Sequence, residues 1–315
     1  MKHLRWVLPI LLAAVVTACA APEAPAREGG MPTEAISFTD ACGREVVLPK
    51  MPERVVSCSG SFAEVWVLSG GALAGTTEDA VSERGMALEE GTAIVGTIKK
   101  PNVEEILAVE PDFVILPADI EGHIEAGQAL DDANITHAYF HIEEFTEYLH
   151  MLKLFTDLTG RADLYEENGL KVRARIDEIK ASCADQPSPT VLFARAYSTG
   201  VRAKGADNMT GIMLEELGAD NIVSRHESLL EELGIEAIIE EDPDFILITT
   251  MGDEKKALEA LENGIMANPA WSGLAAVKEE RVEVLPKELF HYKPNARWAD
   301  AYAYLAQLLY PGTAE

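Results

Sequence analysis

The segment VEEILAVEPDFVIL at Val103–Leu116 returns 132 residues later as IEAIIEEDPDFILI at Ile235–Ile248. In both copies an amphipathic helix leads through an acidic turn with Pro-Asp into an apolar strand, which is typical of a helix that precedes a buried parallel strand. Five of the fourteen positions are identical. A chance match between two common helix–strand units is the alternative explanation.

A second pair of segments favours an internal repeat. The strand expected at Val55–Cys58 precedes SGSFAEVWVLSGG, and the strand expected at Val191–Ala194 follows 136 residues later, before another Gly-rich stretch and a helix. Strands alternate with helices in both halves, which predicts mainly parallel sheets flanked by helices. In the first half the other strands are expected at Leu73–Thr76, Ile94–Gly96, Phe113–Pro117 and His137–Phe140. We therefore expect an α/β protein of two similar lobes with a ligand cleft between them.

The middle of the chain is predicted to be helical. One apolar helical face follows Glu144 and closes at Gly160, and a more polar helix runs from Arg161 to about Ala181. That second helix would be about 30 Å long at 1.5 Å per residue, long enough to connect two lobes. We predict a first lobe over residues 35–160, a connecting helix over 161–186 and a second lobe over 187–315. A stiff helical connection predicts limited hinge motion.

The N-terminus is typical of an exported protein. Lys2 and Arg5 precede the apolar run Trp6–Val16, which is too short to span a bilayer. The following Val-Thr-Ala-Cys resembles the bacterial lipobox, which implies removal of residues 1–18 and lipidation of Cys19; a plain signal peptide is the alternative. Residues 19–34 are predicted to be a disordered tether. We expect a protein held by lipid on the extracytoplasmic face of the cell membrane.

Charge and motifs exclude several classes of function. A net charge of −27 disfavours nucleic acid and anionic lipid surfaces as partners. Neither a phosphate-binding loop nor a catalytic signature occurs, so we expect neither an enzyme nor a bound cofactor. The remaining cysteines match no zinc pattern and form either one disulfide with a spare thiol or three free thiols; they are Cys42, Cys58 and Cys183.

Several motifs together resemble a known family. The segments DACGREVVLPKMPERVV, SGSFAEVWVLSGG, GTIKKPNVEEILAVEPDFVIL and NPAWSGLAAVKEERVEVLP, with the single connecting helix, are similar to the helical-linker class of ABC-transporter substrate-binding proteins. This class includes iron-siderophore, haem and vitamin B12 binding proteins. The resemblance covers essentially the whole mature chain. It implies a monomeric receptor that captures a metal chelate, first of all an iron–siderophore complex, and delivers it to a permease and its ATPase.

The resemblance also implies a docking surface for the permease. In relatives a glutamate on each lobe pairs with permease arginines. The candidates in this chain are Glu64 and Glu104 in the first lobe and Glu215 and Glu236 in the second.

Candidate ligand-binding residues follow from the sheet topology. Ligands of parallel α/β sheets lie beyond the carboxyl ends of the strands. A long loop expected at Arg195–Asp207 has cations that suit an anionic chelate. A histidine and tyrosine near residue 291 are able to ligate haem iron. The full set of candidates is Ser59, Thr77, Lys99, Tyr197, Arg202, Lys204, Met251, His291 and Tyr292.

The nature of the cargo stays open at this stage. Haem, cobalamin and an oxyanion such as molybdate are alternatives on the same fold. A bare zinc or manganese ion would need three or four His, Asp or Glu ligands at the cleft, and the sequence has no His-rich loop. A sensory lipoprotein without a transport role is a further alternative.

Overall fold

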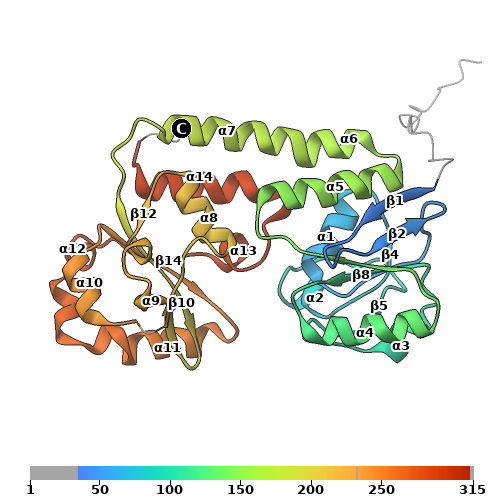
Figure 1. Ribbon diagram of the computed structural model, residues 1–315, viewed down its shortest axis with the longest axis horizontal. Helices are drawn as coiled ribbons and strands as arrows, with labels where there is room; N and C mark the ends of the chain where they lie inside the picture. The colour runs from blue at the N-terminus through green and yellow to red at the C-terminus, as the bar shows by residue number, and fades with distance from the viewer. Residues whose placement is uncertain (1–34, 232, 313–315) are drawn as a thin grey trace, which may run out of the picture.

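The computed structural model describes residues 35–231 and 233–312. The predicted signal peptide, Cys19 and the tether lie outside the described residues. Two α/β lobes stand side by side beneath a layer of long helices (Figure 1). The structure therefore confirms the expected α/β fold of two sheets flanked by helices.

The first sheet has five parallel strands in the order β5-β4-β3-β8-β9. Every residue of β8 and β9 is buried, as expected for apolar strands covered on both faces. Two small antiparallel hairpins, β1–β2 and β6–β7, accompany this sheet. The strands are β1 (Ile36–Thr39), β2 (Glu45–Leu48), β3 (Val55–Ser57), β4 (Leu73–Thr76), β5 (Ala93–Ile94), β6 (Gly96–Thr97), β7 (Lys100–Pro101), β8 (Phe113–Pro117) and β9 (His137–Phe140). The helices are α1 (Gly60–Leu68), α2 (Asp79–Ser82), α3 (Val103–Ala108) and α4 (Glu121–Asp132).

The second sheet repeats this plan with one addition. Strands β12 and β13 pair in parallel with β10, and β14 pairs in parallel with β13. Strand β11 instead pairs with β10 in the antiparallel direction. The strands are β10 (Thr190–Tyr197), β11 (Gly200–Ala203), β12 (Asp220–Asn221), β13 (Phe245–Thr250) and β14 (Val282–Val284). The helices are α8 (Met209–Glu216), α9 (Ser228–Glu231), α10 (Ile235–Glu241), α11 (Glu254–Asn263), α12 (Ala275–Lys278) and α13 (Lys287–Phe290).

The two repeated segments occupy equivalent places. In the first lobe Val55 of β3 pairs with Phe113 of β8, and in the second Val191 of β10 pairs with Phe245 of β13. These pairings are the ones that the two sequence offsets predict. The equivalent pairings favour an internal repeat over a chance match.

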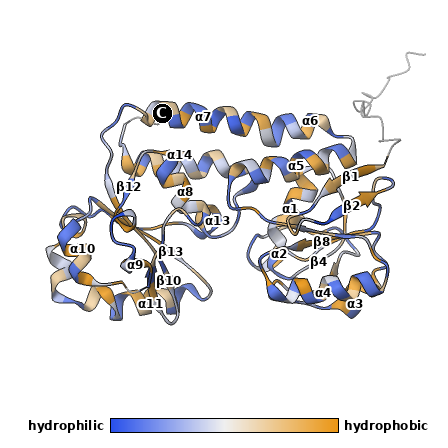
Figure 2. Ribbon diagram, viewed as in Figure 1, coloured by the Kyte–Doolittle hydropathy of each residue, from blue (hydrophilic) through white to orange (hydrophobic). Residues whose placement is uncertain are grey.

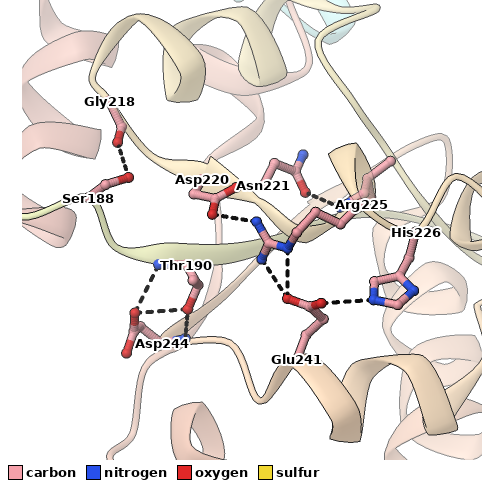
Figure 3. Close-up of polar contacts among 10 residues, drawn as sticks. Ser188, Thr190, Gly218, Asp220, Asn221, Arg225, His226, Glu241 and Asp244 are labelled. Carbon is pink, nitrogen blue, oxygen red and sulfur yellow. Dashed lines mark hydrogen bonds and ion pairs between the residues drawn. The ribbon is translucent and has the colours of Figure 1, made fainter.

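The Pro-Asp turn has the same function in both lobes. Asp112 accepts hydrogen bonds from the backbone amides of Glu53 and Arg54, at 2.8 and 2.9 Å, just before β3 begins. Asp244 accepts from the amide and the hydroxyl of Thr190, both at 2.8 Å, at the first residue of β10 (Figure 3). Each carboxylate thus binds the start of one central strand to the start of the next.

One expectation in the second lobe was wrong. The long loop expected at Arg195–Asp207 is largely a hairpin, because β10 continues to Tyr197 and β11 returns from Gly200 to Ala203. Buried Ala196 and Ala203 alternate with more exposed residues, but alanine is too small and too poor a strand former to reveal this pattern in the sequence.

The helical layer connects the lobes. Helix α5 (Phe145–Thr159) ends at Gly160, whose φ of 68° is left-handed, and the chain then runs through α6 (Ala162–Tyr165), a π-helical turn (Glu166–Leu170) and α7 (Lys171–Cys183). The continuous helical segment formed by α6, the π-helical turn and α7 extends from one lobe to the other (Figure 1). The lobe boundaries at 160 and 187 remain our prediction.

The connecting helix is packed along its length. Its buried face (Val172, Ile176 and Ile179) joins a hydrophobic core that includes residues of both sheets and of α14 (Trp298–Leu309). Polar and apolar residues alternate along the helices of this layer (Figure 2). Arg175 of α7 and Asp300 of α14 form an ion pair at 2.9 Å. These contacts oppose wide opening of the lobes about α7.

Two further properties concern the environment of the protein. Among the described residues, no helix is both long and apolar enough to cross a membrane. Cys42, Cys58 and Cys183 are all free thiols in the described part of the chain. The structure therefore has three free thiols and not one disulfide with a spare thiol.

Candidate functional site

The predicted contacts of the first lobe are mostly buried. Ser59 precedes α1 and is 4% exposed, and Thr77 follows β4 and is fully buried. The backbone packs tightly there, because a Cβ at Gly60 would lie 2.6 Å from the backbone nitrogen of Ala80. Lys99, between β6 and β7, is exposed. Of the three first-lobe candidates, only Lys99 reaches the surface.

The β10–β11 hairpin presents paired cations. Arg195 and Arg202 are directly opposite each other in the register, so their side chains project from the same face of the sheet. Arg195 Nε donates to Thr249 Oγ1 at 3.3 Å, and Arg202 is exposed. Lys204 instead forms an ion pair with Asp207 at 3.3 Å. Two other candidates on this lobe, Tyr197 and Met251, are partly exposed and exposed, respectively.

Further cations surround His291, which follows α13. Burial, followed by the charges of Arg195, Lys287 and Lys293, lowers the pKa of His291 to about 4. Its imidazole is therefore neutral at pH 7. Lys287 Nζ donates to the carbonyl of Gly252 at 2.8 Å, which fixes this lysine at the carboxyl end of β13. We use the name cationic face for Arg195, Arg202, Lys287 and Lys293. Lys287 also lies 3.8 Å from a carboxylate oxygen of Glu254, and Lys293 is paired with Glu143 at 2.7 Å.

Tyr292 lies where the second lobe meets the first. Its ring centroid is 5.1 Å from that of His291. Burial, together with the carboxylates of Glu83 and Glu254, raises the pKa of Tyr292. The phenol form of Tyr292 is therefore favoured in the unliganded protein.

A buried polar cluster joins the two lobes. The Arg84 side chain is 4% exposed; it donates to Ser61 Oγ at 3.2 Å and to the backbone carbonyl of Lys293 at 3.0 Å, and it forms an ion pair with Glu64. Asn295 Nδ2 donates to the carbonyl of Ser61 at 2.9 Å and to Glu64. Glu64, a candidate for permease docking, is thus engaged within the protein.

A second connection between the lobes centres on Glu143, after β9. Its carboxylate forms an ion pair with Lys293 at 2.7 Å and accepts the backbone amide of Met209 at 3.0 Å. Glu143 also groups with Asp119 and His141, one ligand atom of each lying within 4.8 Å of the others. The residues beyond the carboxyl ends of the strands therefore include this acidic group in the first lobe, whereas in the second lobe they include the cationic face.

Sequence reasoning missed several of these residues. Asp119 follows β8, Lys287 begins α13 shortly after β14, and Lys293 follows α13. A count of the charges in these segments would have found them. Arg84 and Glu143 depend on contacts between distant segments, for which the sequence has no local signal.

The repeat distinguishes among the docking candidates. Glu104 in the first turn of α3 and Glu236 in the first turn of α10 occupy the same position of the two repeated segments, and both are exposed. Glu215, near the end of α8, is also exposed but lies outside these two repeated segments.

A separate hollow lies away from these loops. It is found at the amino ends of β10 and β13, beside β14 and the end of α14. Because ligands of such sheets bind at the carboxyl ends, we do not assign the cargo to this hollow.

Known proteins share this architecture. The periplasmic binding protein family matches residues 55–289. The "Probable siderophore-binding lipoprotein YfiY" of Bacillus subtilis (strain 168) is 23% identical over 88% of each chain. The Fe(3+) dicitrate-binding periplasmic protein FecB of Escherichia coli (strain K12) is 23% identical, over 75% of this chain and 77% of that protein.

Among solved structures, a periplasmic haem-binding protein from Pseudomonas aeruginosa is 26% identical with a TM-score of 0.63, covering 84% of this chain and 94% of that one. These relatives are solute-binding proteins and not enzymes. With the family match extending over most of the chain, this protein belongs to the periplasmic binding protein family.

Proposed function

We propose that this protein is the extracytoplasmic receptor of an ABC importer and captures an anionic ferric chelate of the siderophore or citrate class. The names of the relatives YfiY and FecB support ferric chelates as cargo. The cationic face is the observation that carries the proposal to this chain. The lipid anchor at Cys19 remains part of the proposal, supported by the lipobox resemblance.

The charge distribution explains why the cargo would be anionic. The protein has a net charge of −27, so an anion approaching most of its surface would be repelled. On the cationic face, Arg195 and Arg202 are cross-strand neighbours, and Lys287 and Lys293 both lower the pKa of His291. Charge-assisted hydrogen bonds from such groups to carboxylate or catecholate oxygens stabilise a bound chelate more than neutral ones do.

Delivery to the permease would use the two equivalent glutamates. Glu104 and Glu236 are exposed, one on each lobe, and each lies in the first turn of its helix. Charge reversal of both residues should abolish uptake of the chelate by cells while leaving its binding in solution unchanged. The matched control is charge reversal of Glu262, an exposed residue of α11 that is not a docking candidate, which should leave uptake intact.

Haem is the second candidate. The neutral imidazole of His291 has a free lone pair for iron, and a haem-binding structure is among the similar ones. Haem binding through His291 would produce a Soret band that His291→Ala removes. The same band in His291→Ala would exclude that residue as the iron ligand.

A titration of the purified protein with ferric citrate, a ferric catecholate siderophore, haemin, cobalamin and molybdate tests the proposal. Heat release in calorimetry reports binding for each. We expect saturable binding of an anionic ferric chelate with a dissociation constant below about 1 μM, that is, about −8 kcal/mol. Exclusive binding of cobalamin, molybdate or haemin would overturn it.

A further inference from the structure

We propose that Asp119, His141 and Glu143 form a binding site for a divalent first-row transition-metal ion. One ligand atom of each lies within 4.8 Å of those of the other two. Asp119 follows β8 and the other two follow β9, and these strands pair in parallel up to Pro117 and Phe140. Two adjacent strand ends of the sheet therefore fix the group. The site goes beyond the proposed function, because the ion binds without a chelate.

The charges of the group favour a cation. Two carboxylates this close repel each other unless a positive charge lies between or beside them. Lys293 neutralises part of the charge of Glu143, at 2.7 Å. Asp119 is exposed and has neither a hydrogen bond nor an ion pair within residues 35–231 and 233–312. A divalent ion would supply the missing positive charge.

The imidazole has a partner that suits a metal ligand. Nδ1 of His141 faces Oε1 of Glu147 at 3.4 Å. Glu147 is itself held by the backbone amides of Glu143 and Glu144, at 2.6 and 3.0 Å. A carboxylate at one ring nitrogen orients a histidine and leaves the lone pair on the other nitrogen, as is usual for metal-binding histidines.

The donor set selects the class of ion. Two carboxylates with one imidazole suit Mn²⁺, Fe²⁺ or Zn²⁺, whereas Ca²⁺ and Mg²⁺ prefer oxygen ligands alone. Three protein ligands also leave coordination positions for water. The site is therefore expected to discriminate against Ca²⁺.

The ion pair of Lys293 couples this site to the second lobe. Lys293 and the amide of Met209, both from the second lobe, already contact the two oxygens of Glu143. An ion at the site competes with the ammonium group for the same carboxylate. Removal of the ammonium should therefore strengthen ion binding.

The test is calorimetric titration of the purified protein with Zn²⁺ and with Mn²⁺, without any chelate, at about 0.15 M salt to screen diffuse binding. We expect one ion per protein, with affinity lowered about tenfold or more in Asp119→Asn and in His141→Ala. Lys293→Met should raise it. Asp132→Asn and His150→Ala, which change exposed residues outside the group, are the matched controls and should leave it unchanged.

Three results would overturn the proposal: no saturable binding, binding unaffected by Asp119→Asn and His141→Ala, or equal affinity for Ca²⁺ that His141→Ala does not change. Thermal unfolding of each variant checks that the fold is intact. Because no chelate is present, ion binding and chelate binding succeed or fail separately.

Discussion

The two copies of the helix–Pro-Asp–strand unit have the same backbone plan but carry opposite charges at their ligand edges. Asp112 and Asp244 each bind the start of a neighbouring central strand. Beyond the carboxyl ends of these strands, the first lobe presents Asp119 and Glu143, whereas the second presents the cationic face. Turns and core residues therefore determine the repeat, while loop side chains determine the chemistry of each lobe.

The lobes also differ at the edge remote from the ligand. In the first, Arg54 Nε donates to the backbone carbonyl of Val109 at 2.9 Å, at the end of α3. In the second, Arg225 forms ion pairs with Asp220 and Glu241, and Glu241 also contacts His226 Nε2 at 2.8 Å (Figure 3). An arginine thus stabilises the end of the equivalent helix in both lobes, through a backbone carbonyl in one and a carboxylate in the other.

The largest expected effect concerns the cationic face. Arg195→Ala combined with Arg202→Ala should weaken binding of an anionic ferric chelate about 100-fold or more, since each lost charge-assisted hydrogen bond costs about 1.5–3 kcal/mol. Calorimetry measures the change. Lys255→Ala, which removes an exposed cation of α11, is the control. Unaltered affinity in the double variant would remove the hairpin from the site.

The second effect concerns His291 and pH. Its pKa is about 4 in the folded protein, below its ordinary value of about 6.5 in an unfolded chain. Between these pH values the unfolded chain binds a proton that the folded protein does not, so the unfolding free energy falls as the pH drops from about 6.5 to 4. This contribution is at most ~3 kcal/mol. His291→Asn should flatten this part of the stability profile in urea denaturation; His150→Asn should not.

The third effect tests whether the two turns are equivalent. Asp112→Ala and Asp244→Ala each leave backbone amides at a strand start without an acceptor, which costs about 1–3 kcal/mol. Urea denaturation should show similar losses for both variants. A substantial loss in one lobe and none in the other would mean that the turns share a sequence but not a role.

The smallest effect sharpens the electrostatic contrast. Asp119→Asn removes an exposed negative charge from the first lobe and should strengthen binding of an anionic chelate by ~0.5 kcal/mol at low salt, and less as salt is added. Calorimetry at two salt concentrations measures it. Weaker binding of the chelate would show that Asp119 acts on the cargo in another way.

Periodic apolar segments made most of the fold predictable. The strands Leu73–Thr76, Phe113–Pro117 and His137–Phe140 have the bounds that the sequence indicates. The β10–β11 hairpin was not predictable, because its buried positions are alanines and its outer positions include two arginines, which resemble a loop. For the site, the strand-end rule found His291 and Arg202 but placed Ser59 and Thr77 at the surface, where tight packing of α1 and α2 buries them.

Contacts between the lobes were beyond sequence reasoning for a physical reason. The pair of Glu143 with Lys293 joins residues 150 positions apart, and that of Asn295 with Glu64 joins residues 231 apart. Such pairs depend on the relative orientation of the lobes, which the packing of α7 on α14 determines and which no local pattern encodes.

The central claim is that the cationic face selects an anionic ferric chelate. The most direct measurement compares, by calorimetry on the unaltered protein, ferric citrate and an anionic catecholate siderophore with a neutral or cationic ferric hydroxamate. We predict saturable binding of at least one anionic chelate and binding of the hydroxamate that is weaker by about tenfold or more, a difference of about 1.4 kcal/mol. Preference for the cationic chelate, or equal affinity for all of them, would contradict it.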